Sequence, residues 1–208
     1  MPHACAVHAG SYTHVSLYAT TLPECLARTG SRSGLFPGGP VPYSADMEST
    51  LPLLAGLLLK RHATLATAES CTGGLVGAAL TSLPGSSAWF LGGIIAYSNS
   101  LKQRLLGVSP GVLARHGAVS PETARAMAEG ARAATGADIA VSLTGIAGPD
   151  GGTPAKPVGL VYMAVAGPGG TPCYEHRFPG NRAEIRSAAV KSALLHVREM
   201  LEGEPGGT

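Results

Sequence analysis

The segment Ala68-Glu69-Ser70-Cys71-Thr72-Gly73-Gly74 lies between an apolar run with β-strand character at 63–68 and a helix-forming run at 75–82. The first amides of a helix have no backbone partner and carry partial positive charge. Glycines let a bound group approach such a backbone closely. The segment therefore predicts a site for an anion or a developing oxyanion, with Ser70 at its mouth.

Helices and strands alternate on either side of this segment. Helices are predicted at about 51–61, 73–82, 98–106, 110–116, 120–136 and from Asn181 onward, and strands at 63–69, 90–97, 138–143, 158–166 and 173–178. Gly167 to Gly170 would join the last two strands as a hairpin. This order predicts an α/β fold, a three-layer α/β/α sandwich around a mixed, mostly parallel sheet with a late hairpin.

The first 46 residues differ in composition from the rest of the chain. They are rich in His, Ser, Thr, Gly and Pro and lack a helical or strand period, so they bury little apolar area against the entropy of ordering. We expect 1–46 to be a disordered extension, 47–203 to be one folded domain, and 204–208 to be a loose tail. Thr50 as a cap and Pro52 in the first turn would begin the first helix.

Composition and charge narrow the classes of function. The net charge is only +2, and Lys and Arg form no run, which argues against a nucleic-acid surface. Four cysteines without Cys-x-x-Cys spacing and seven unpaired histidines predict a cytoplasmic, reduced protein with no metal site. The apolar runs are too short to span a membrane. Helix faces of small residues permit a homo-oligomer without indicating one.

Three polar or glycine-rich stretches follow predicted strands, at 70–74, 97–99 and 144–148. Because ligands of α/β sheets bind beyond the carboxyl ends of the strands, we expect these stretches to form one site.

Ser70 needs a base if it is a nucleophile. Lys102 lies about one helical turn after Tyr97, so its amine could reach back over the strand end, and a partly desolvated lysine has a lowered pKa. Tyr97 could instead relay the proton or position the amine, and the pattern does not decide between the two. The oxyanion hole would consist of three backbone N–H groups, those of Thr72, Gly73 and Gly74.

Simpler interpretations compete with this chemistry. A serine before a helix is a cap in roughly two cases out of three, and an isolated lysine is usually solvated. Glu69 could cap the helix or form a salt bridge. Cys71 is a rival nucleophile, because it would also lie near the helix N-terminus.

The loop after the third of these strands suits a nucleotide. Thr144 and Gly145 at a strand end are typical of phosphate or ribose contact, although they could form only a turn. Arg182, at the start of the last helix, is a candidate phosphate ligand.

Several segments together resemble one known family. They are Ala68 to Gly74, Tyr97-Ser-Asn-Ser-Leu-Lys102 with Leu106-Gly-Val108, Gly117-Ala-Val-Ser120, Thr144-Gly-Ile-Ala-Gly-Pro149 and Lys156-Pro-Val-Gly159. In this order they resemble the carboxy-terminal domain family of the competence/damage-inducible protein CinA, the nicotinamide-nucleotide amidohydrolases. The resemblance covers about Leu51 to Leu201.

This resemblance implies hydrolysis of the carboxamide of nicotinamide mononucleotide to nicotinate mononucleotide and ammonia, a step of pyridine nucleotide salvage. Ser70 would attack the amide carbon, Lys102 and Tyr97 would handle its proton, and no metal or organic cofactor would be needed. The substrate-binding set it implies adds Asn99, Thr144, Gly145 and Arg182. Two other functions remain open: a nucleotide-binding regulatory domain without chemistry, and a hydrolase of another pyridine-nucleotide or amide substrate.

Overall fold

The computed structural model describes residues 45–203, with side chains from residue 49 onward. Its elements are α1 (Ala45–Lys60), β1 (Leu65–Glu69), α2 (Leu75–Thr81), the 3₁₀ turn η1 (Ser86–Ala88), β2 (Phe90–Ile95), α3 (Asn99–Leu106), α4 (Pro110–His116), α5 (Pro121–Thr135), β3 (Ile139–Gly145), β4 (Leu160–Ala166), β5 (Cys173–Arg177) and α6 (Arg182–Gly203). The predicted disordered extension, apart from its last two residues, and the predicted tail at 204–208 lie outside the described residues.

The strands form one mixed sheet in the order β2-β1-β3-β4-β5. Strand β1 pairs in parallel with β2 and β3, whereas β4 is antiparallel to both β3 and β5. All strands except β4 therefore point the same way, which confirms the mixed, mostly parallel sheet with a late hairpin. As a result, the carboxyl ends of β1, β2 and β3 and the amino end of β4 meet at one edge of the sheet.

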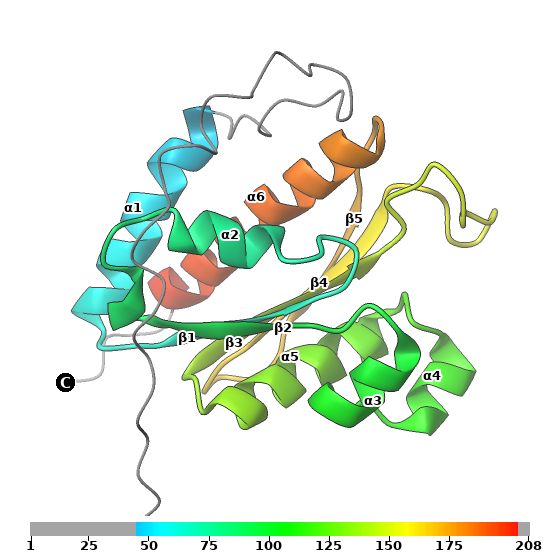
Figure 1. Ribbon diagram of the computed structural model, residues 1–208, viewed down its shortest axis with the longest axis horizontal. Coiled ribbons are helices and arrows are strands. Elements are labelled where there is room, and N and C mark those ends of the chain that lie inside the picture. The colour runs from blue at the N-terminus through cyan, green and yellow to red at the C-terminus, as the bar shows by residue number, and fades with distance from the viewer. Residues whose placement is uncertain (1–44, 204–208) are drawn as a thin grey trace, which may run out of the picture. The chain divides into compact units, whose positions relative to one another are not determined.

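Helices cover both faces of the sheet. Figure 1 shows α1, α2 and α6 on one face and α3, α4 and α5 on the other, which confirms the three-layer α/β/α arrangement. The larger core cluster lies under α1, α2 and α6 and includes Leu54, Leu80, Leu143, Met163 and Leu194. A smaller cluster under α3 to α5 includes Leu106, Met127 and Ala140. None of the helices within 45–203 combines the length and apolarity that a bilayer crossing requires.

Helix α1 begins at Ala45, earlier than the sequence suggested, so the expected boundary between residues 46 and 47 falls inside it. Thr50 is buried within the helix rather than capping it, and Pro52 lies in the helix interior. A proline removes one backbone hydrogen bond from a helix. Here the fully buried Leu54 and Leu58 pack into the core after Pro52, and such packing supplies most of a helix's stability.

Two predicted helix starts are confirmed by their hydrogen bonds. Ser120 Oγ accepts the N–H of Thr123 at 3.2 Å and caps α5. Asn181 and Glu184 form a reciprocal capping box before α6, in which Asn181 Oδ1 accepts from Glu184 N at 3.2 Å and Glu184 Oε2 accepts from Asn181 N at 2.8 Å. Helix α6 therefore begins at a well-capped end.

A pair of histidines joins the edge strand β5 to α6. The Nε2 atoms of His176 and His196 lie 2.8 Å apart, and His196 Nδ1 lies 2.8 Å from Glu199 Oε2. Burial lowers the pKa of His176 below its ordinary 6.5, the neighbouring His196 lowers it further, and Glu199 opposes both. Folding therefore disfavours the protonated form of His176.

We expect His176 to make the free energy of unfolding depend on pH. In the unfolded chain His176 takes up a proton at about pH 6.5, whereas in the folded chain it does so only at lower pH, so stability falls as the pH drops through 6.5. Urea denaturation at pH 7.5 and 5.5 should show a smaller loss for His176→Gln than for the wild type. The control is His62→Asn, which removes an exposed histidine at a positive φ (51°) that Asn tolerates. Equal losses for the wild type and His176→Gln would contradict the prediction.

Candidate functional site

The side chains of Ser70 and Lys102 meet where β1 and β2 end. Lys102 Nζ donates to Ser70 Oγ at 3.1 Å, to the carbonyl oxygen of Ala96 at 2.8 Å and to that of Tyr97 at 3.2 Å. Lys102 is 1% exposed and Ser70 is 8% exposed. The alternative of a solvated lysine is therefore wrong.

Burial sets the protonation of Lys102. It lowers the pKa of this amine below its ordinary 10.5, and only a charge interaction with Cys71 opposes the shift. Within residues 45–203 the amine forms no ion pair with a carboxylate. In the neutral amine, the Ala96 and Tyr97 carbonyls can accept its two hydrogens. The nitrogen lone pair then faces Ser70 Oγ, in position to accept a proton.

The amides at the N-terminus of α2, which the sequence suggested as a site for a bound anion, are occupied by the side chain of Glu69. Glu69 is 1% exposed. Its Oε2 accepts from Thr72 Oγ1 at 2.7 Å, Gly74 N at 2.9 Å and Val76 N at 3.1 Å, and its Oε1 accepts from Gly77 N at 2.9 Å. The carboxylate thus caps the helix from the end of β1. The capping interpretation of Glu69 is confirmed, and a ligand cannot occupy the same amides.

The turn after Ser70 depends on its two glycines. Gly73 and Gly74 have φ values of 60° and 99°, in the left-handed region that favours glycine. Helix α2 begins only at Leu75, and its N-cap is Gly74, so Ser70 is not the cap.

The same turn leaves fewer free N–H donors for the predicted oxyanion hole. Gly73 N donates to Ser70 O at 3.1 Å and Gly74 N donates to Glu69, so two of the three predicted donors are already engaged. The amides of Cys71 and Thr72 have no acceptor on another residue of the described chain. They are the remaining candidate donors beside Ser70.

The thiol of Cys71 is not a competing nucleophile at neutral pH. Burial raises its pKa from 9.0 to about 11, and the charge of Glu69 adds to the rise, although the Cys71 backbone, Arg186 and Lys102 oppose it. Because the thiolate is the nucleophilic form, this protonated thiol is unreactive.

Tyr97 and Asn99 lie at the rim of the site. Tyr97 is 61% exposed, and its hydroxyl accepts from Arg182 Nη2 at 3.4 Å. Only the Tyr97 backbone carbonyl contacts the lysine amine. Asn99 is the exposed first residue of α3, and its side chain makes no hydrogen bond within the described residues. The phenol is therefore not hydrogen-bonded to the Ser70–Lys102 pair.

Thr144 and Gly145 lie at the carboxyl end of β3, and both make contacts within the fold. Thr144 is 1% exposed, and its Oγ1 donates to the carbonyl oxygen of Ala118 at 2.7 Å. A Cβ added to Gly145 would lie 2.7 Å from Leu160 O, so the glycine allows two strands to approach closely. Neither residue lines either of the two pockets described below. Their contact with phosphate or ribose stays a prediction.

A pocket of about 630 Å³ lies between the 146–159 loop and the start of α6. The loop contributes Ala147, Pro149 and Val158, and the other wall consists of Gly180, Asn181, Arg182, Ala183 and Arg186. Arg182 Nη1 donates to the Gly148 carbonyl oxygen at 2.8 Å. The candidate phosphate ligand of the sequence analysis therefore does line a pocket.

Arg186 connects this pocket to the serine. Its Nη2 donates to Thr72 O at 2.7 Å, two residues beyond Ser70. Its Nε is buried and has no hydrogen-bond partner within residues 45–203. Sequence reasoning missed Arg186, although its spacing of four residues from Arg182 places both on one face of α6.

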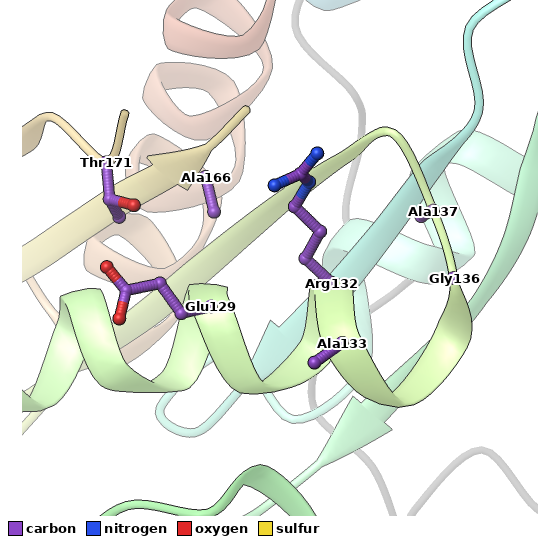
Figure 2. Close-up of a pocket in the computed structure, with 7 residues that line it drawn as sticks. All are labelled: Glu129, Arg132, Ala133, Gly136, Ala137, Ala166 and Thr171. Carbon is purple, nitrogen blue, oxygen red and sulfur yellow. The ribbon is translucent and has the colours of Figure 1, made fainter. Parts of the chain in front are cut away.

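A second pocket, of about 360 Å³, lies at the opposite edge of the sheet. Figure 2 shows Glu129 and Arg132 of α5 extending toward it, with Ala166 at the end of β4 close by. It contains none of the predicted site residues.

Comparison with known proteins identifies the family of this chain. The family model described as the CinA C-terminal domain matches residues 47–201. The chain belongs to the CinA C-terminal domain family. The family's match begins within α1 and ends near the end of α6, so it includes every residue of the candidate site.

CinA-like proteins of Prochlorococcus marinus and of a Geobacter species are 49% identical over 172 residues and 51% identical over 159 residues. These matches cover 82% and 76% of this chain but only 39% and 38% of the relatives. The chain thus spans about two fifths of the length of the curated relatives it matches.

Two solved structures of the family match most of this chain. The competence/damage inducible protein CihA of Agrobacterium tumefaciens has a TM-score of 0.71 and 41% identity, over 81% of this chain and 99% of that one. The competence damage-inducible protein A of Klebsiella pneumoniae has a TM-score of 0.74 and 34% identity, over 76% and 99%. The α/β fold is therefore shared with CinA-family structures.

The buried cap on α2 leads to a prediction about stability. In Glu69→Gln the side chain keeps its shape, but its amide donor would face backbone N–H groups, so we expect a loss of about 3 kcal/mol in the free energy of unfolding. Glu184→Gln is the matched control, because Glu184 also caps a helix but is exposed, and it should lose less than about 1 kcal/mol. Equal losses in urea denaturation would contradict a special role for the buried carboxylate.

Proposed function

We propose that the chain hydrolyses the carboxamide of nicotinamide mononucleotide, with Ser70 as nucleophile and Lys102 as general base. One observation carries the proposal. The buried Lys102 amine lies 3.1 Å from Ser70 Oγ, has a lowered pKa, and is held from behind by two backbone carbonyls. A serine activated by a neutral lysine is a sufficient nucleophile for acyl transfer.

In the first step Ser70 Oγ attacks the amide carbon while its proton passes to Lys102 Nζ. The carbonyl oxygen becomes an oxyanion, and the Cys71 and Thr72 amides are the candidate donors for it. Collapse of the tetrahedral intermediate breaks the C–N bond. The Lys102 ammonium returns the proton to the departing nitrogen, so ammonia leaves and a nicotinoyl ester of Ser70 remains.

In the second step water attacks this ester. Lys102, neutral again, accepts a proton from the water as the water oxygen bonds to the ester carbon. The ester C–O bond then breaks, and the Lys102 ammonium returns its proton to Ser70 Oγ, which releases nicotinate mononucleotide and restores the neutral lysine. The base role belongs to Lys102 rather than Tyr97, because the Tyr97 phenol is directed to Arg182 and makes no hydrogen bond with Ser70 or Lys102.

Recognition of the nucleotide is assigned to the pocket at the start of α6. Arg182 and Arg186 both line it, and guanidinium groups are well suited to phosphate. The buried, unpartnered Nε of Arg186 supplies a donor that an anion would satisfy. This assignment replaces Thr144 and Gly145 with Arg186 and retains Arg182.

Ammonia release from nicotinamide mononucleotide tests the proposal. We expect Ser70→Ala and Lys102→Met to lower kcat by about 10³-fold or more, because each removes part of one proton-transfer unit. Tyr97→Phe should retain turnover within about tenfold. A Lys102→Met enzyme with near-normal turnover, or a Tyr97→Phe enzyme as inactive as Ser70→Ala, would overturn the assignment of the base. Binding of the nucleotide by a wild type that releases no ammonia would favour a regulatory domain.

The pH profile provides an independent test. Lys102 acts as a base only when neutral, so kcat/KM should rise with pH and level off above the pKa of Lys102, which burial holds below 10.5. The rise should be about tenfold per pH unit on the acid limb, as for one ionisation. A profile that is flat from pH 6 to 10, or that falls with pH, would remove Lys102 from the mechanism.

A further inference from the structure

The Lys156-Pro-Val-Gly159 motif has no role in the chemistry described above, yet its lysine makes a well-defined contact. Lys156 Nζ donates to the carbonyl oxygens of His116 and Val119, both at 2.7 Å. These acceptors are 40 and 37 residues away in the chain. No ion pair holds this lysine within the described part of the chain.

The acceptors of Lys156 belong to the connection between α4 and α5. His116 is the last residue of α4, and carbonyls at a helix C-terminus lack backbone partners and carry partial negative charge. An ammonium group there is favourable without a carboxylate. Lys156 therefore completes the end of α4 from a distant loop.

The 116–119 connection is a rigid anchor because side chains bind each of its carbonyls. Gly117 O accepts from the hydroxyls of Ser120 and Thr123, at 3.2 Å and 2.7 Å. Ala118 O accepts from Thr144 at 2.7 Å. Together with the two bonds from Lys156, these contacts fix the segment against α5 and the end of β3.

Lys156 connects the 116–119 segment to the wall of the pocket. It lies two residues before Val158, which lines the pocket with Ala147 and Pro149. A Cβ on Gly148 would lie 2.6 Å from Val158 Cγ1, so the two arms of the 146–159 loop are in close contact. In Figure 1 this loop (yellow) projects from the sheet at the end where α4 lies.

The opposite arm of the loop is held by a second cation. Arg182 Nη1 donates to Gly148 O at 2.8 Å and ties that arm to α6. The loop is thus fixed by Arg182 from the pocket side and by Lys156 from the far side. Of the two, only Lys156 lies outside the pocket, so its contribution can be tested without removing a group that contacts substrate.

We propose that Lys156 is a positioning residue for substrate recognition, which clamps the 146–159 wall of the pocket to the α4–α5 connection. This inference rests on the proposed function. Loss of the clamp frees Val158 and its neighbours but leaves Ser70, Lys102 and Glu69 in place, because none of these three contacts the loop through a hydrogen bond. Affinity for the nucleotide therefore depends on Lys156, whereas the rate of acyl transfer does not.

The test compares Lys156→Met with Lys156→Arg, which keeps charge and donors, and with Lys60→Met, which removes an exposed lysine from the last turn of α1. For Lys156→Met we expect the KM for nicotinamide mononucleotide to rise about tenfold and kcat to stay within about twofold. Lys156→Arg should recover most of the KM, and Lys60→Met should match the wild type. Hydrolysis of p-nitrophenyl acetate, which needs the serine but no nucleotide pocket, should be unchanged in all three variants.

Hydrogen–deuterium exchange supplies a readout that does not depend on the substrate. Exchange in 146–159 and 116–119 should become at least about tenfold faster in Lys156→Met, while the peptide around Ser70 should not change. Unchanged exchange would overturn the clamp. Faster exchange with an unchanged KM, or a loss of kcat equal to the loss in p-nitrophenyl acetate hydrolysis, would overturn its role in recognition. If the wild type releases no ammonia, the proposed function fails, and the exchange result alone decides the clamp.

Discussion

The buried carboxylate of Glu69 is the interaction on which the site depends. A charge removed from water is tolerated only when hydrogen bonds replace its hydration, and here a hydroxyl and three amides at the start of α2 do so. The same bonds connect the last residue of β1 to the helix that follows. Ser70 lies within this closed loop, so its position is determined by the fold and not by a flexible turn.

This arrangement keeps the serine turn and the pocket on different elements of the fold. The buried Ser70 and Lys102, to which we assign the chemistry, meet where β1 and β2 end and α3 begins. The pocket belongs to the β3–β4 loop and to α6. Arg186 is the link, since it lines the pocket and also donates to Thr72 O beside the serine. A group bound in the pocket can therefore affect the turn after Ser70 through the side chain of Arg186.

Sequence patterns predicted the sheet, the helices on both faces and the Ser70–Lys102 pairing, because hydrophobic period, caps and strand ends are local signals. They failed where a residue's partner lies far along the chain. Thr144 has the sequence pattern of a ligand-binding residue, but its hydroxyl donates to the carbonyl oxygen of Ala118. Gly73 and Gly74 suggest free amides, but Ser70 O and Glu69 occupy them. The early start of α1 was missed because Thr50 and Pro52 have the local pattern of a helix start, whereas both lie inside the helix.

The reversed direction of β4 has a consequence for how members of this family can diverge. Because β4 is antiparallel to β3, the connection between them is a hairpin loop, and both strands remain paired from Gly145↔Val161 inward whatever the loop contains. Insertions and replacements at its exposed tip, residues 151–155, leave the spacing of the sheet unaltered. The pocket wall that this loop forms can therefore change as a separate module, while the contact between Ser70 and Lys102 stays in place.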